Sequence, residues 1–177
     1  MDSARAAIVL FSAKGDTMAP RTKDNDIGLA PADAPVRAEY DRDFYSWLME
    51  QARLVREGRW EALDRDNLAE EIESLGREQF NKLESALRVL MLHMLKWDHQ
   101  PAKRSRSWAI SIRQQRLELD DVLADNPGLR PRTGEAIERA YRKARLQAAK
   151  ETGLIEKRFP ATCPYSWDDI VSREFAR

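Results

Sequence analysis

The chain has 177 residues, 34% of them charged, and its 30 lysines and arginines balance 30 aspartates and glutamates. A net charge of zero gives no general attraction to nucleic acid or to an anionic membrane, and no apolar run reaches the roughly 18 residues of a membrane-spanning helix. The single cysteine, Cys163, excludes an internal disulfide and fits a reducing compartment, so we expect a cytoplasmic protein without membrane contact.

The beginning of the chain differs in character from the rest. Residues 1–39 show no helical period and contain Pro20, Pro31 and Pro35, which predicts a flexible N-terminal tail. Beyond this tail, helical periods predominate and no alternating strand pattern competes with them. We therefore expect a single all-helical domain over residues 40–177.

A short first helix is predicted to begin at Asp41 as its N-cap and to end near Glu57. Gly58 follows at the position where a left-handed residue commonly ends a helix. The expected buried side of this helix consists of Phe44, Trp47, Leu48, Leu54 and Val55.

Asp64 is the expected N-cap of a much longer helix that extends as far as Trp97. At about 100° per residue, a set of side chains along this segment falls within about 40° of one line on the helix surface. This pattern predicts an amphipathic helix with one face toward the core. Gly76 is its weakest helix former. The line consists of Leu68, Ile72, Leu75, Gln79, Ala86, Leu90, His93 and Trp97.

Three further helices are expected. One begins near Ser105 or Ser107 and ends at the turn signal DNPG. The next covers about Thr133–Thr152, where alanines on one face permit close helix approach, and Ser166 caps a short last helix. The predicted fold class is all-α: a helical bundle of four to five helices with one long central amphipathic helix.

His93 lies near the centre of the predicted core-facing line, and two interpretations of it are open. A buried neutral imidazole can be a hydrogen-bonded core residue, which is the interpretation we favour. A histidine held beside carboxylates can instead act as a general base in a hydrolase-like enzyme. The candidate catalytic residues of such an enzyme are Glu70, Glu71, His93, Lys96 and Arg116.

Residues 103–116 contain five cations and no acid. Arginines around a tryptophan are typical of phosphate and single-strand binding. The alternative, which we favour, is that this helix packs antiparallel to the preceding one and pairs with its acidic first half. The candidate nucleic-acid-binding residues are Arg104, Arg106, Trp108 and Arg113.

Metal and cofactor sites find little support in the sequence. Two histidines and one cysteine do not form a zinc ligand set in any familiar spacing. The Glu-x-x-His pairs of di-metal bundles are missing, because Leu90 and Lys96 stand three residues before His93 and His99. No glycine-rich phosphate loop is present either. We expect no metal and no cofactor.

Five blocks in this order resemble one known family. They are YDRDFYSWLMEQARLVREGRWEALDRDNLAEEIESLGR, HMLKWDHQP, SWAISIRQQR, AYRKARLQAAKETGL and FPATCPYSWDDI. Over about residues 40–172, the chain is similar to the bacterial family known as domain of unknown function number twenty-nine. The resemblance implies a small, mainly helical bacterial protein and transfers no catalytic residue.

The sequence therefore favours a non-enzymatic interaction or self-associating module, whose partner is a second copy or an unidentified protein. Abundant aromatic residues, alanines suited to close packing and the missing catalytic motifs support this interpretation. A hydrolase-like enzyme and a nucleic-acid or antitoxin-like binder acting through the basic third helix are the alternatives.

Overall fold

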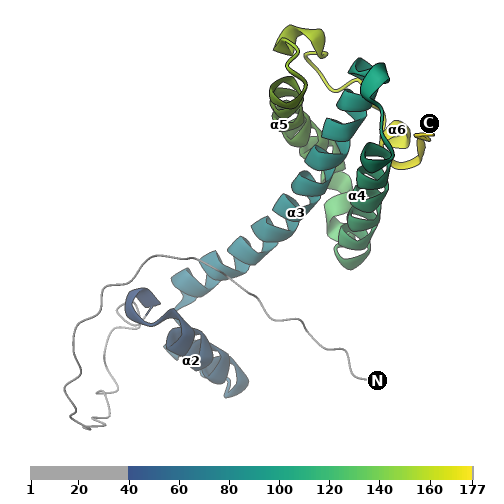
Figure 1. Cartoon of the computed structure of the whole chain (residues 1–177). Helices are drawn as coiled ribbons and strands as arrows, with labels where there is room; N and C mark the ends of the chain where they lie inside the picture. Colours follow the sequence, from purple (N-terminus) through teal and green to yellow (C-terminus); the bar gives the residue numbers. More distant parts are fainter. Residues whose placement is uncertain (1–39, 177) are drawn as a thin grey trace, which may run out of the picture. The chain divides into compact units, whose positions relative to one another are not determined.

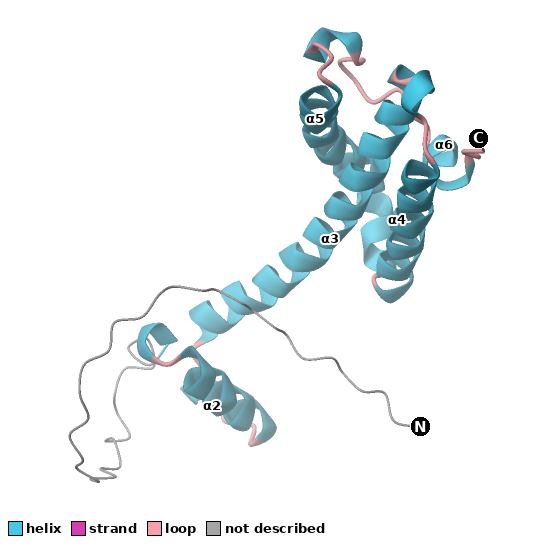
Figure 2. Ribbon diagram, viewed as in Figure 1, coloured by secondary structure: helices cyan, strands magenta, loops and turns pink. Residues whose placement is uncertain are grey.

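The computed structural model describes residues 40–176, and all regular structure among them is helical (Figures 1 and 2). This confirms the predicted all-α class, whereas the predicted tail, residues 1–39, lies outside the described residues. The helices are α2 (Phe44–Arg56), α3 (Arg65–His99), α4 (Arg106–Asp125), α5 (Thr133–Thr152) and α6 (Trp167–Ser172). Short 3₁₀ turns connect them: η1 (Trp60–Ala62), η2 (Pro101–Lys103), η3 (Pro127–Arg132) and η4 (Glu156–Arg158).

The ends of the helices follow the local capping chemistry. Asp64, Ser105 and Ser166 accept backbone N–H bonds as N-caps of α3, α4 and α6, as predicted. Asp43, and not the predicted Asp41, caps α2, because its carboxylate accepts both the backbone N–H and the hydroxyl of Ser46, at 3.0 and 2.6 Å.

Two glycines end helices in the left-handed conformation. Gly58 follows α2 with a φ of 70°, and Gly153 follows α5 with a φ of 74°. A β-carbon strains this backbone region, which explains why glycine stands at both positions.

The second half of α3 is the centre of the bundle. It packs between α4 and α5, and α6 lies beside α4 (Figure 1). Alanines spaced four residues apart on α5 are fully buried, which lets this helix approach α3 closely, as predicted. Each fully buried leucine or methionine contributes about 1.5–3 kcal/mol. The core contains Leu83, Leu87, Leu90, Met91, Met94, Leu95, Ile112, Leu119, Ala136, Ala140, Ala144, Ala148, Phe159 and Ile170.

The first half of α3 carries the same apolar face without a helix of the bundle against it. Ile72 is 60% exposed and Leu75 is 44% exposed. The prediction that these two residues face a core was therefore wrong. The period of α3 correctly identifies the apolar face, but α4 and α5 cover only its second half.

Helix α2 is attached to the start of α3 by polar contacts of buried residues. The Trp47 indole N–H donates to the Asp64 carboxylate at 3.3 Å, and the backbone N–H of Asp64 donates to the side chain of Gln51 at 2.9 Å. Trp47 is buried as predicted, but Phe44 and Val55 are 38% and 42% exposed, contrary to the prediction.

Candidate functional site

The predicted catalytic residues are divided between the two halves of α3. Glu70 and Glu71 lie in its first half, whereas His93 and Lys96 lie in its second half. At 1.5 Å per residue, about 33 Å of helix separates Glu71 from His93. These acids and this imidazole therefore cannot act together on one small substrate within a single chain.

Glu71 makes a contact that anchors the start of the described chain. The hydroxyl of Tyr40 donates to its carboxylate at 2.5 Å. This hydrogen bond raises the pKa of Tyr40 to about 12. The ring of Tyr40 also lies edge-on to Trp47, with 4.8 Å between the centroids. Glu70 is exposed next to this contact.

Lys96 belongs to a polar group that joins three helices. Its ammonium lies 2.7 Å from the carboxylate of Glu151 on α5 and 4.8 Å from the ring centre of Trp108 on α4. Gln147 donates to the same carboxylate at 2.9 Å and accepts a hydrogen bond from Arg88 at 2.6 Å. The group links α3 to its two neighbours and leaves Lys96 engaged as an ion-pair partner.

His93 is half-buried close to this group. Its Nδ1 atom is buried and has no hydrogen-bond partner among the described residues. Burial lowers the pKa of His93, and the nearby positive charge of Lys96 lowers it further, while Glu151 opposes the shift. The imidazole is therefore neutral near pH 7. It is compatible with the favoured scaffold interpretation, although the expected hydrogen bond to Nδ1 is not formed.

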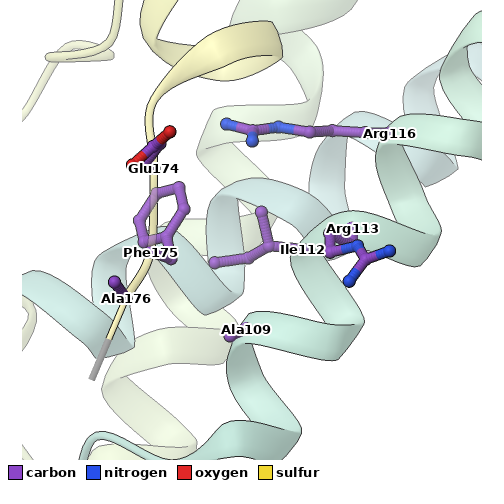
Figure 3. Close-up of a pocket in the computed structure, with 7 residues that line it drawn as sticks. All are labelled: Ala109, Ile112, Arg113, Arg116, Glu174, Phe175 and Ala176. Atoms are coloured by element: carbon purple, nitrogen blue, oxygen red, sulfur yellow. The ribbon is translucent and has the colours of Figure 1, made fainter.

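Arg116 holds the C-terminal segment against α4. Its guanidinium donates to the backbone carbonyls of Ile170, Asp169 and Arg173, at 2.7, 3.2 and 2.8 Å. Burial lowers its pKa. Figure 3 shows this side chain directed across a hollow of about 290 Å³ toward the segment that contains Phe175. Its contacts are those of a structural clamp and lie apart from the group around Lys96.

The four predicted nucleic-acid-binding residues have different surroundings. Arg104 donates to the carbonyl of Trp97 at 2.9 Å and lies over that indole. Trp108 is half-buried beneath Lys96, whereas Arg106 and Arg113 are exposed. Two of the four are thus occupied by contacts within the domain.

The expected pairing of the basic third helix with the acids of the second was wrong. Among the described residues, the ion pairs that acids in the first half of α3 form are with cations of α3 itself. Glu73 lies 3.5 Å from Arg77, and Glu78 lies 3.4 Å from Lys82. The physical reason is position along α3, because α4 packs against the other half.

Two buried or half-buried acids that connect elements were missed by sequence reasoning. Glu84 is 4% exposed on α3 and pairs with Arg139 and Lys143 of α5. Asp98 accepts from Arg173 at 2.6 Å and from the hydroxyl of Tyr165 at 2.9 Å. Glu84 stands 16 residues after Leu68, which at about 100° per residue places it about 160° from the predicted core-facing line, so the helical period gave no signal for it.

The first half of α3 exposes an apolar strip that we call the open face. It consists of Leu68, Ala69, Ile72, Leu75 and Gly76. Leu68 is half-buried and the other four residues are exposed. Ala69 and Gly76 project little beyond the backbone, so another helix can approach this part of the strip closely.

A hollow of about 770 Å³ adjoins the open face, and we call it the arginine-rimmed hollow. Its walls come from α3, η3 and α5, and the side chains of Phe80 and Leu129 supply apolar surface. Arg132 and Arg139 lie over the ring of Phe80, at 4.1 and 5.1 Å from its centre. The lining residues are Glu73, Gly76, Arg77, Phe80, Asn81, Gly128, Leu129, Arg132 and Arg139.

Within residues 40–176, no three histidine, cysteine, aspartate or glutamate side chains gather as metal ligands would. None of the described helices combines the length and the apolar composition that crossing a membrane requires.

These observations define the class of protein: an all-helical domain in which half of a long central helix forms the core of a bundle and the other half presents an apolar strip. The model of one family, described as domain of unknown function DUF29, matches residues 39–176. The chain belongs to this family, as the sequence resemblance predicted. No curated protein and no solved structure matches it.

Proposed function

We propose that this chain is a non-enzymatic interaction module that binds another protein chain through the open face of α3. One observation carries the proposal. Residues about 18 positions apart on an α-helix point in the same direction, because five turns separate them. Ile72 and Leu90 form such a pair, yet Leu90 is fully buried and Ile72 is 60% exposed.

The energetics of apolar burial support a binding role for this strip. An isoleucine or leucine gains about 1.5–3 kcal/mol when its side chain is fully buried. Ile72 and Leu75 lie one turn apart, so one partner helix can cover both at once. Contiguous exposed apolar surface of this kind marks interaction sites more often than scattered single residues do.

The proposal places the protein in the bacterial cytoplasm, where its partner is a second copy or another protein. The family resemblance supports a bacterial source. Cys163 fits a reducing compartment, because a single cysteine forms no internal disulfide.

The hydrolase-like and nucleic-acid alternatives remain predictions. The helical distance between Glu71 and His93 weighs against the first. The engagement of Arg104 with Trp97 weighs against the second, although Arg106 and Arg113 are free to meet solvent.

Site-specific photo-cross-linking in the native cell tests the proposal. A photoreactive phenylalanine analogue replaces Ile72 in one variant and Leu146 in a control variant. Leu146 is a suitable control because it is 58% exposed on α5, on the bundle. We expect a defined protein adduct from position 72 and none from position 146. Equal labelling from both positions, or no adduct from position 72, would contradict the proposal.

A further inference from the structure

We infer that α4 carries an interface of its own, through which two copies of this chain pair as antiparallel helices across a two-fold axis between Arg113 and Gln114. The surface is the side of α4 that faces away from the bundle, and we call it the outer face of α4. It does not include the open face of α3, so the inference stands apart from the proposed function. The outer face consists of Arg106, Ile110, Arg113, Gln114, Leu117, Asp120, Asp121 and Ala124.

The described part of the chain leaves the outer face of α4 uncovered. All eight of its residues are exposed, and its two large apolar side chains, Ile110 and Leu117, are 50% and 65% exposed. They stand two turns apart, so one partner helix can contact both. The side of α4 toward the bundle is formed by the buried residues Ile112, Leu119, Val122 and Leu123.

The positions along the outer face match those of a second copy that runs in the opposite direction. At about 100° per residue, Arg106, Ile110, Leu117 and Asp121 fall within about 30° of one line on the helix surface. With the axis between Arg113 and Gln114, Ile110 of each copy lies level with Leu117 of the other. Arg106 lies level with Asp121 in the same way. Each contact therefore occurs twice, as a two-fold interface requires.

The charges of the outer face change sign along α4. Arg106 and Arg113 stand in its first half, and Asp120 and Asp121 stand in its second half. About 22 Å of helix separates Arg106 from Asp121, so these two side chains cannot pair within one chain. A parallel copy would place arginine against arginine, whereas an antiparallel copy places arginine against aspartate at both ends of the contact.

The two Arg113 side chains lie on the same flank of the axis, and helix geometry separates their charges. Side chains of a helix lean toward its own N-terminus, so the two guanidinium groups lean in opposite directions in an antiparallel pair. Each leans toward Asp120 of the other copy, which lies on the same flank and leans toward it in turn. Like charges therefore diverge at the axis while opposite charges approach.

The interface is small, because each copy contributes only two large apolar side chains from the outer face. Contacts of this size hold transient rather than permanent complexes. We therefore expect a dimer that forms at high protein concentration, dissociates on dilution and weakens as salt screens the charge pairs.

A charge swap tests the inference in the full chain by sedimentation over a range of concentrations. One variant carries Arg106→Glu and the other carries Asp121→Lys, so each alone places like charges at both ends of the contact. A one-to-one mixture restores opposite charges at both ends. We expect each variant to dimerise at least threefold more weakly than the wild type and the mixture to recover the dimer. Glu118→Lys makes the same charge change beside the outer face and should dimerise like the wild type.

Leu117→Ser tests the apolar part of the interface and should weaken the dimer at least tenfold. Ile72→Ser should leave it unchanged, because the open face takes no part in it. Circular dichroism shows whether each variant is folded. A wild-type chain that stays monomeric at all concentrations, or a mixture of folded charge variants that stays monomeric, would overturn the inference. Loss of the dimer in Ile72→Ser instead of Leu117→Ser would place the second copy on the open face and would overturn it as well.

Binding of a single-stranded DNA oligonucleotide distinguishes the remaining use of the basic half of α4. We expect no binding that depends on Arg106. A chain that stays monomeric and binds the oligonucleotide, but loses this binding in Arg106→Glu, would assign the outer face to nucleic acid and end the inference. The adduct expected from position 72 is unaffected by either result, so the proposed function is tested separately.

Disulfide formation gives a second test that does not depend on charge. Gln114→Cys in a Cys163→Ser background brings two thiols together beside the axis, and Leu146→Cys in the same background is the control, since Leu146 is 58% exposed on α5. We expect rapid oxidation to a covalent dimer only for the first variant. Equal cross-linking of both variants, or none of Gln114→Cys, would contradict the two-fold axis at this position.

Discussion

Ile72 and Leu90 occupy equivalent positions on the two halves of one helix, yet their surroundings are opposite. Leu90 is fully enclosed by the bundle, whereas 60% of Ile72 meets solvent. The same contrast separates Gly76 from Met94, which also lie 18 positions apart. The comparison shows that one amphipathic pattern serves folding where α4 and α5 cover it and is available for binding where they do not.

The largest expected effect comes from the matched pair Leu90→Ala and Ile72→Ala. Leu90→Ala leaves a cavity in the core and should lower the free energy of unfolding by about 2–5 kcal/mol. Ile72→Ala in dilute protein should change it by less than about 0.5 kcal/mol, because the side chain is largely exposed. Urea unfolding followed by circular dichroism measures both. Similar losses at the two positions would refute the contrast between the halves.

Arg116→Ala should have the next largest effect. It tests how α6 is held against α4, on the side of the molecule where the second half of α3 is covered. The substitution removes the hydrogen bonds to three backbone carbonyls at α6 and the segment after it. A single hydrogen bond to a charged group contributes up to about 1.5–3 kcal/mol. We expect the three bonds together to contribute about this amount, so the free energy of unfolding should fall by about 1.5–3 kcal/mol. Hydrogen exchange in α6 should increase. Arg113→Ala on the same helix is the control, since Arg113 is exposed. Unchanged hydrogen exchange in α6 of the Arg116→Ala variant would contradict the role of Arg116 as a clamp.

Gly76→Ala should have a smaller effect and the opposite sign. Alanine is the better helix former by about 0.5–1 kcal/mol, and among the described residues the added β-carbon meets nothing within 4 Å besides the adjacent backbone of its own helix. Dilute protein should therefore gain stability by this amount, measured as a rise in thermal midpoint. A loss of stability would mean that a part of the same chain covers Gly76.

The smallest expected effect is a dependence of stability on pH through His93. Its pKa is lowered in the folded state, so the unfolded chain binds the proton more readily. The stability associated with neutral His93 is therefore complete above the pKa of the unfolded chain and is lost as the pH falls below it. Comparing unfolding at pH 7 and pH 5, we expect His93→Gln to lose less stability on acidification than the wild type. His99→Gln controls for the loss of a ring at the same end of α3. An equal change in both variants would count against the assignment to His93.

The local signals in the sequence predicted most of the fold. Capping residues such as Asp64, Ser105 and Ser166 act on their own helix, so their effect is visible in a few consecutive residues. The same holds for Gly153, whose left-handed conformation ends α5. The family could be predicted because whole blocks of residues carried the resemblance.

The surroundings of a helix face could not be predicted in the same way. The period of α3 shows which side chains share a face, but whether another element covers Ile72 depends on where α4 and α5 pack. For the same reason, the partners of Glu84 and Asp98 were missed, since Arg139 and Arg173 are more than 50 residues away in the chain.

The most direct measurement of the central claim is amide hydrogen exchange along α3 in the dilute purified chain and in the same chain mixed with native cell extract. The account predicts that protection of residues 68–79 is low in the dilute chain and rises in the extract, because a partner chain covers the open face, while protection of residues 83–97 stays constant within the bundle. Protection of residues 68–79 that is the same in both conditions would contradict the claim that the open face binds another protein chain.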